Sequence, residues 1–523
     1  MADELLADET CRVFSKLSQP QEPGVQRFIV GEDRSPRLMT TAEIAQDLSD
    51  PFAALLLLNG VFPSTAQELL DALDAATGEG DRLREQRSFM LGEGSQLPVR
   101  EVDTDSTNRG LRFLIARGGG NDGPDLIISA SHPFEGLVEL MAWDMVHQGF
   151  NFYRTLGDGG RWVWAGNSRH ALQQPTRGKG PFESHPSGNL IMKELKFPWV
   201  HWHSFKVHIS AAVFEEADVP REHQWFLDKS GAETCETDVV MPSIVRWTNV
   251  RFERVLSGAV TIDPVLLIEH VVTCPTVNLA SSGTESAAAK LGSSIDLPPG
   301  FFVDADAMEA VGLPEPPAFA VPGEMYASSL ETFGFHMTDG SFSQPGDTHF
   351  AFVVPERAFE DIEVLRQAIA RGVISPRLAA ALLMVDFPNP VFSRKRAKLL
   401  ASVPSVPASD PDGLSEAIAA SILAASEESP DGTPERDFAA RWNLGDDGWR
   451  ESFSLELNDY YTAVESRLGS QQGFNDFVRL AESRRHHVRD LPIFESRLLF
   501  PETNLDRQDL VMSPNGTVTE AAG

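Results

Sequence analysis

The sequence predicts an α+β fold with a helical N-terminal section, a central antiparallel β region and a mostly helical C-terminal half. Three observations support this prediction. Residues 1–85 carry helix-capping residues ahead of apolar runs with helical spacing. Between residues 86 and 166 the pattern changes to short runs in which apolar and polar residues alternate, as they do in strands. From residue 301 apolar residues again recur at helical spacing.

Three helices are predicted in the first section. Thr41 caps the run AEIAQDL, and the run PFAALLLLNG forms a second helix. Ser64 caps a third helix, STAQELLDALDAAT, with Glu68 close behind it as in a capping box. Gly78 and Gly80 end that helix.

The central section, residues 86–280, is predicted to contain an antiparallel meander. Its alternating runs are RSFML, LRFLIAR, DLIISAS, LVELMAWD, FNFYRTL and RWVWAG. The run GDGG at 157–160 has the composition of a hairpin turn between the last two strands. Trp162 and Trp164 fall on one side of the last strand, which predicts that one face of the sheet packs on a broad apolar surface.

Small and polar residues at 281–300 predict a linker, with the run SSGTESAAAKLGSS. Asp263 and Pro264 predict a helix start ahead of it, because proline is favoured at the first helical position. Residues 301–502 are predicted to form a mainly helical domain. Hydrophobic periodicity is lost from residue 503, which predicts a mobile tail over 503–523.

The charge balance of the chain is strongly acidic. Lys and Arg number 44 against 76 Asp and Glu, which gives a net charge of −32. A field of this sign repels phosphate backbones and anionic lipids, so neither nucleic acid nor a membrane surface is expected as a partner. A small-molecule substrate, a protein partner or a second copy of the chain remains as the expected partner.

Cysteine content and hydropathy predict a cytoplasmic protein. Only Cys11, Cys235 and Cys274 occur, at wide spacing, which excludes a disulfide framework and any CxxC motif. The first residues are acidic and polar, unlike a signal peptide, and no apolar run approaches the length of about 18 residues that a membrane span needs. No nucleotide-binding motif occurs, since the glycine run at 118–120 lacks the spacing of a phosphate-binding loop.

The most unusual stretch is PFESHPSGNLIMKELKFPWVHWHSFKVHIS at 181–210. It is rich in imidazoles interleaved with the indoles of Trp199 and Trp202. Imidazoles among large aromatic rings suit metal ligation, haem contact or proton transfer. Its histidines are His185, His201, His203 and His208.

Geometry limits how these histidines can act together. On a strand, His201 and His203 point to one face and His208 to the other, whereas on a helix His201 and His208 share a face. The three are the predicted metal ligands, yet no single regular element directs all of them at one ion. A further ligand would have to come from elsewhere in the chain. The alternative is structural, with buried His and Trp side chains satisfying backbone groups.

Neighbouring residues supply candidates for cofactor binding and catalysis. Met192 is either a soft ligand to a cofactor or a core residue, because its unbranched thioether suits both. Lys193 and Glu194, together with His203, are the candidate acid and base groups, with a solvated Lys–Glu ion pair as the alternative. Trp199 and Trp202 are the expected walls of the cofactor pocket.

One resemblance covers residues 135–210. The hairpin FNFYR…RWVWAGNS, the glycine-rich approach and the run HPSGNLIMKELKFPWVHWHS resemble bacterial c-type-cytochrome-related proteins. In that family a CxxCH haem-attachment motif precedes the corresponding run. Here the five matching residues are PFESH at 181–185, so His185 is kept and both cysteines are absent. The resemblance implies either a haem held by ligation and packing alone, with His185 or His203 as axial ligand, or a scaffold that has lost its cofactor.

The favoured function is therefore a redox or oxygen-handling protein, an oxidoreductase if it is an enzyme, that binds haem or a transition metal through the stretch 185–208. The alternative is a non-catalytic binding or assembly protein that uses the same aromatic stretch as an interface. A third hypothesis is a cofactor-free hydrolase or isomerase that uses His and Glu as base and acid.

Overall fold

The computed structural model describes residues 23–92, 111–155, 161–190, 229–280, 292–490 and 502–521, apart from residues 121, 131–133, 135, 231, 340, 341, 346–351 and 353. The described chain divides into two units, unit 1 up to residue 250 and unit 2 from residue 251. The boundary falls inside helix α8 (Met241–Leu256) and so differs from the predicted linker at 281–300. Of that linker, 281–291 lies outside the described residues, and strand β11 (Ser294–Asp296) pairs with strand β12 (Ala320–Pro322).

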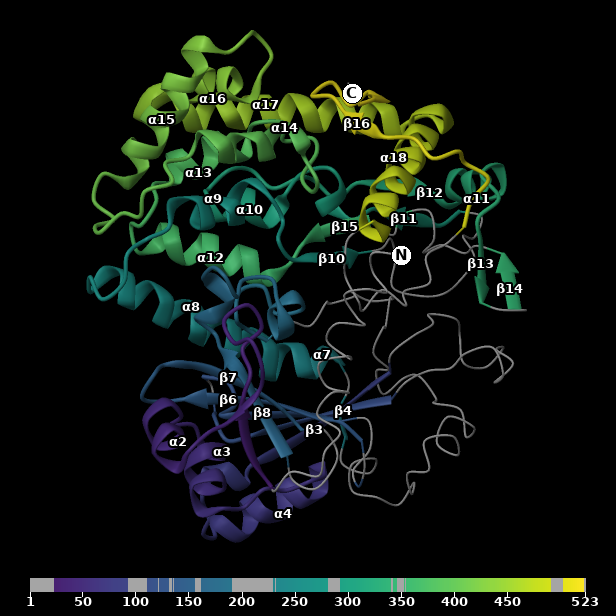
Figure 1. Cartoon of the computed structure of the whole chain (residues 1–523). Coiled ribbons are helices and arrows are strands. Elements are labelled where there is room, and N and C mark those ends of the chain that lie inside the picture. The colour runs from purple at the N-terminus through teal and green to yellow at the C-terminus, as the bar shows by residue number, and fades with distance from the viewer. Residues whose placement is uncertain are drawn as a thin grey trace. The chain divides into compact units, whose positions relative to one another are not determined.

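Unit 1 is built on a nine-stranded mixed sheet, which confirms the predicted α+β class (Figure 1). Strands β3 to β8 form an antiparallel meander in chain order, while β1 pairs in parallel with β8 and β9 in parallel with β3. The predicted GDGG turn at 157–160 lies outside the described residues. The strands are β1 (Gly24–Arg27), β2 (Arg37–Leu38), β3 (Gln86–Gly92), β4 (Leu111–Arg117), β5 (Leu126–Ala130), β6 (Val138–Asp144), β7 (Gly149–Thr155), β8 (Arg161–Asn167) and β9 (Lys229–Ser230).

Three helices cover one face of this sheet (Figure 1). They are α2 (Thr41–Asp47), α3 (Pro51–Leu55) and α4 (Ala66–Ala76). Phe52 of α3 lies with its ring centroid 4.6 Å from that of Trp162, and Trp162 and Trp164 are both buried. The predicted packing of one sheet face on a broad apolar surface is confirmed, and the surface consists of these helices.

The helices begin one residue away from the predicted caps. The backbone N–H of Glu43 donates to the hydroxyl of Thr40 rather than Thr41, and that of Glu68 donates to Thr65 rather than Ser64. Ser64 still takes part, since its backbone N–H donates to the Glu68 carboxylate. Adjacent hydroxyl residues give the same sequence signal, and backbone geometry chooses between them.

Strand β1 was not predicted, because the section 1–85 is helical by sequence pattern. Its four residues GVQR carry no alternation of their own. β1 is stabilised instead by pairing with β8, with Gly24 opposite Arg161 and Arg27 opposite Trp164. A pairing between residues so far apart in the chain leaves no local signal.

Unit 2 is mainly helical, with short two-stranded sheets. The predicted helix start at Asp263 is confirmed, since the Asp263 carboxylate accepts from the backbone N–H of Leu266 and Pro264 is the first residue of α9. Strand β10 (Val277–Ala280), which follows α9 in the chain, pairs antiparallel with strand β15 (Val354–Arg357). The helices of eight or more residues are α9 (Pro264–Val272), α11 (Gly323–Thr332), α12 (Phe359–Ala370), α13 (Pro376–Leu383), α15 (Leu414–Glu428), α16 (Pro434–Trp442), α17 (Gly445–Leu468) and α18 (Gln471–Arg489).

The C-terminal segment differs from the predicted mobile tail. Strands β16 (Leu510–Met512) and β17 (Val518–Glu520) form a hairpin, and Leu510 and Met512 are buried. The side chain of Asn389 accepts from the N–H of Met512 and donates to its carbonyl oxygen, each over 2.9 Å. A strand this short has no periodicity to detect, and its order comes from contacts with distant residues.

Candidate functional site

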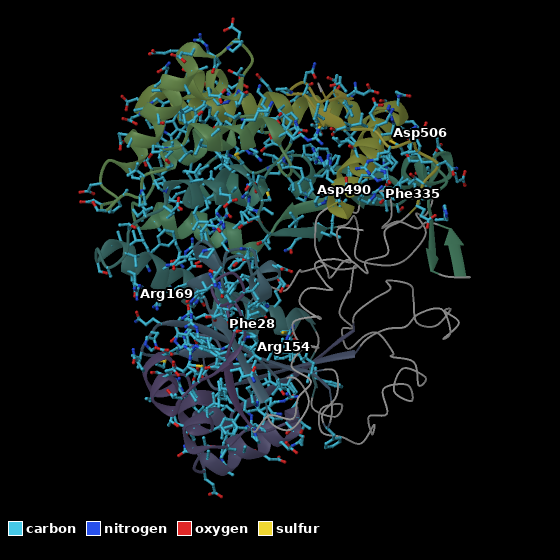
Figure 2. All side chains as sticks on the ribbon, in the orientation of Figure 1. Phe28, Arg154, Arg169, Phe335, Asp490 and Asp506 are labelled. Carbon is cyan, nitrogen blue, oxygen red and sulfur yellow. The ribbon has the colours of Figure 1, made fainter. Side chains whose placement is uncertain are left out.

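The described histidines of unit 1 lie at one end of the sheet, which we call the histidine end. Strand β6 ends there at Asp144, β7 begins there, and β8 ends there at Asn167. His147 lies in the turn between β6 and β7, and His170 lies in the short helix η3 (His170–Leu172) that follows β8. Arg169, which is labelled in Figure 2, donates to the carbonyl oxygen of His147 and so ties these two segments together.

His185 reaches the same end after the short helix η4 (Gly180–Glu183). Its Nδ1 lies 2.7 Å from the carbonyl oxygen of Asn189. A carbonyl oxygen can only accept, so Nδ1 carries a proton, and in the neutral ring Nε2 is the nitrogen with the lone pair. The ring packs against Phe152, with the centroids 5.4 Å apart, and Phe152 in turn contacts Phe182.

Two glycines allow this loop to approach the sheet. A Cβ on Gly188, whose φ is +71°, would lie 2.3 Å from the carbonyl oxygen of Ser168. A Cβ on Gly166, whose φ is +111°, would lie 3.2 Å from the ring of Phe182 and 3.4 Å from that of His170. Glycine therefore fits where no other residue does without displacing the backbone or the rings.

His170 is fixed in this arrangement by its neighbours. The backbone N–H of Asn167 donates to Nδ1 over 3.1 Å, and the ring lies edge-on to Trp164. Burial lowers the pKa of His170, although the nearby Glu32 carboxylate opposes the shift. The imidazole is therefore mainly neutral near pH 7, with Oδ1 of Asn167 2.9 Å from Nδ1 and a carboxylate oxygen of Glu32 3.6 Å from Nε2.

A buried polar network lies behind the histidine end, and no sequence pattern indicated it. The carboxylate of Asp50 accepts from the hydroxyl of Tyr153, from the amide of Asn151 and from the N–H of Ala53. Burial raises the pKa of Asp50 to about 6 against the pull of these donors. Asn151 also donates to Asp144 over 3.3 Å, so one amide links two carboxylates.

The pKa of Asp144 is shifted in the opposite direction to that of Asp50. Burial acts to raise its pKa, but hydrogen bonds from the backbone and ring of His147 and from the N–H of Ser49 outweigh it, so its pKa is lowered. Neighbouring carboxyl groups with pKa values pushed in opposite directions are typical of sites that handle protons. For Asp50, the sequence signal is Ser-Asp-Pro at 49–51, in which the helix-capping aspartate is also a titratable group.

Only one of the predicted site residues lies within the described chain. His185 is at the histidine end, partly buried. The others lie outside the described residues: Met192, Lys193, Glu194, Trp199, His201, Trp202, His203 and His208. Over the described ranges, no group of three or more His, Cys, Asp or Glu side chains is arranged to hold a metal ion. Of the predicted site residues, the described part of the chain therefore places His185 alone.

The described tryptophans of the aromatic region belong to the core of unit 1. Trp143, Trp162, Trp164 and Trp247 are each at most 3% exposed. The indole N–H groups of Trp162 and Trp247 donate to the carbonyl oxygens of Pro63 and Ser187. These four side chains are not surface anchors, and the other tryptophans of this region, Trp199, Trp202 and Trp225, lie outside the described residues.

Comparisons of the chain with protein-family models, with curated proteins and with solved structures found no match. None of the helices in the described part of the chain combines the length and apolar character that a bilayer-spanning segment requires.

Proposed function

We propose that unit 1 binds a haem or a transition-metal ion at the histidine end, with His185 as a ligand, and serves a redox or oxygen-handling function. The observation that carries this proposal is the hydrogen bond from Nδ1 of His185 to the carbonyl oxygen of Asn189. Ligating histidines usually donate their second ring N–H to a carbonyl or carboxylate, which fixes the tautomer and the ring orientation. His185 has this arrangement, and its Nε2 is the nitrogen that would ligate.

The surroundings of His185 support the same proposal. Phe152 and Phe182 form an apolar wall beside the ring, which would exclude water from a bound group. Gly188 and the buried Asn189 hold the loop against the sheet. When bound, a haem or metal ion would supply the electron-transfer or oxygen-binding chemistry, and these residues would bind, orient and shield it.

The remaining members of the site are proposed from the sequence. His201 and His203 would complete the ligand set, with His208 as a further ligand and Met192 as an axial or soft ligand. Trp199 and Trp202 would line the pocket, and Lys193 and Glu194 with His203 would move protons. The location proposed is the cytoplasm, and the acidic charge of the chain supports a small molecule or another protein, rather than nucleic acid, as the partner.

The test is the absorption spectrum and metal content of the purified full-length protein and of the variant His185→Asn. Asparagine places an amide N–H near the position of Nδ1 and so keeps the bond to Asn189, but it lacks Nε2. We expect a Soret band, or stoichiometric iron, copper or zinc, in the wild type and its loss in His185→Asn.

The matched control is His336→Asn in unit 2, because Nδ1 of His336 also lies 2.9 Å from a carbonyl oxygen, that of Gly334. This variant should keep the spectrum and the metal. A colourless, metal-free wild type that gains nothing on addition of haem or metal salts would contradict the proposal. A spectrum unchanged in His185→Asn would overturn the assignment of His185.

A further inference from the structure

Two buried carboxylates of unit 1 meet at a single side-chain amide. Asp50 and Asp144 are 0% and 1% exposed. Nδ2 of Asn151 lies 2.8 Å from Oδ2 of Asp50 and 3.3 Å from Oδ2 of Asp144. An amide NH₂ group has two hydrogens, so it can donate to both oxygens at once. The two carboxylates are therefore close neighbours that are both kept from water.

The orientation of this amide is set by an indole. The Nε1–H of Trp164 donates to Oδ1 of Asn151 over 3.1 Å. An indole N–H can only donate, so the amide oxygen faces Trp164 and the NH₂ group faces the carboxylates. Asn151 and Tyr153 are two positions apart on β7 and so share one face of the sheet. The hydroxyl of Tyr153 is the second side-chain donor to Oδ2 of Asp50.

The two carboxylates differ in the charge of their partners. The donors to Asp50 are uncharged, since they are a hydroxyl, a side-chain amide and a backbone N–H. Asp144 accepts from backbone N–H groups and also from Nδ1 of His147, a ring that can carry a positive charge. An ionised Asp50 is thus a buried charge without a cationic partner, next to a second negative charge. A carboxyl group in this position is stabilised by taking up a proton.

The charged and titratable groups that face the pair lie on neighbouring strands and in the turn between them. Strand β6 contributes Asp144, β7 contributes Tyr153, and the turn at residues 145–148 contributes His147. Arg169 adds a cation at the carbonyl oxygen of His147, whereas β8 contributes the uncharged indole of Trp164. The side chain of His147 is 36% exposed, so this ring connects the buried pair with solvent. A proton needs such a connection but no cavity.

We propose that Asp50 and Asp144 form a proton-binding pair that holds one proton in mildly acidic solution and releases it as the pH rises, and that this proton is a pH-sensitive switch of the turn between β6 and β7. Asp50 holds the proton, and the charge of Asp144 strengthens its binding. The proton passes between water and the Asp50 carboxylate, and no other bond is formed or broken. The switch is independent of any haem or metal ion at the histidine end.

The turn senses the proton through Asp144. Oδ1 of Asp144 accepts from the backbone N–H groups of Val146 and His147, so this carboxylate holds the turn in its conformation. When Asp50 is ionised, its charge repels that of Asp144 and favours a protonated His147. When Asp50 is protonated, this repulsion is absent. The turn carries Met145 and Val146, which are 58% and 71% exposed, so the switch acts on an apolar part of the surface.

The first test is NMR of the full-length chain with ¹³C-labelled aspartate, in which Asp50→Asn and Asp144→Asn identify the two carboxyl signals. We expect the Asp50 signal to titrate at a pH of about 6 and the Asp144 signal at a lower pH. Asp144→Asn removes the neighbouring negative charge, so the midpoint of the Asp50 titration should fall by about one pH unit, the scale of one nearby charge.

The control for this test is Asp71→Asn, which neutralises an exposed carboxylate on α4 and should leave the midpoint of Asp50 unchanged. A wild-type midpoint at the ordinary value of 3.8, or no titration of Asp50 between pH 4 and 8, overturns the proposal. An unchanged midpoint in Asp144→Asn, with its fold verified by circular dichroism, also overturns it, because Asp50 would then bind its proton without Asp144.

The second test follows the backbone amide signals of Val146 and His147 in the ¹⁵N-labelled full-length chain over the same pH range. We expect both signals to shift with a component at the midpoint of Asp50, and Asp50→Asn should remove that component. The component that comes from the His147 ring should remain in the variant. Identical titration curves of these amides in wild type and Asp50→Asn would overturn the switch, because the turn would then respond to His147 alone.

Discussion

The hydroxyl of Tyr153 donates to the carboxylate of Asp50, which lies 103 positions earlier in the chain. The contact joins strand β7 to the start of helix α3, and both residues are buried. Asp50 is at once a helix cap, through the N–H of Ala53, and an acid whose pKa burial raises to about 6. Its protonation should therefore be visible in the stability of unit 1.

Asp50→Asn should change how stability depends on pH. The pKa of Asp50 is about 6 in the folded protein against an ordinary value of 3.8, so the folded state holds the proton more tightly. The stabilisation of the folded state that comes from protonation of Asp50 is present in full below about pH 4 and is lost as the pH rises toward 6. A shift of about two pKa units corresponds to about 3 kcal/mol.

The measurement is the free energy of unfolding of wild type and Asp50→Asn from pH 4 to 7, followed by tryptophan fluorescence. The wild type should lose up to about 3 kcal/mol relative to the variant over this range. Tyr153→Phe removes a hydrogen bond that lowers the pKa of Asp50, so the loss should extend to higher pH. A difference between wild type and Asp50→Asn that is constant with pH would contradict the prediction.

Gly188→Ala should destabilise unit 1 and displace the His185 loop. The new Cβ would meet the carbonyl oxygen of Ser168 at 2.3 Å, in addition to the strain of a φ of +71°. Gly178→Ala is the matched control, since Gly178 has a φ of +69° but nothing within 4 Å of the added Cβ. The control should lose about 1–2 kcal/mol, the strain of a left-handed conformation, and Gly188→Ala clearly more. Equal changes in Tm for the two variants would show that the close approach to Ser168 does not matter.

Arg357→Met should destabilise unit 2 strongly. Arg357 and Asp304 are both buried and lie 2.6 Å apart, so removal of the guanidinium leaves an unpaired buried carboxylate. Breaking such a pair costs about 3–5 kcal/mol. Arg366→Met, which breaks a solvent-exposed pair with Glu309, should cost less than about 1 kcal/mol. Denaturant unfolding measures both, and similar values for the two variants would be inconsistent with a buried pair.

Asn389→Ala should loosen the C-terminal hairpin. The variant loses both hydrogen bonds to the backbone of Met512, which leaves a buried N–H and a buried carbonyl without those partners. Each such group costs about 1–3 kcal/mol. Hydrogen–deuterium exchange over residues 510–512 should become faster than in the wild type. Unchanged protection there would mean that packing of Leu510 and Met512 holds the segment without Asn389.

Sequence patterns predicted the features of the fold that depend on nearby residues. Helix α9 was predicted to begin at Asp263, because a capping carboxylate and a proline at the first helical position act within one turn. The meander from β3 to β8 was predicted because each strand alternates and pairs with the next one along the chain.

Features that depend on distant residues were not predictable in this way. Strand β1, the link between Asp50 and Tyr153, and the pair of His270 and Asp361 all join segments far apart in the chain. In the candidate site, His185 was singled out from its neighbours in sequence, but its hydrogen bond to Asn189 depends on how Gly188 lets the loop turn against the sheet. Hydrophobic periodicity and the spacing of residues in the sequence do not indicate such contacts.

The parallel pairing of β1 with β8 also has a consequence for how the chain folds as it is synthesised. Gly24 leaves the ribosome long before Arg161, the residue it will face. The meander from β3 to β8 assembles from strands that are adjacent in sequence. Strand β1 can pair with β8 only after β8 is in place. Strand β1 is thus made before the meander but can join the sheet only after β8 has been made.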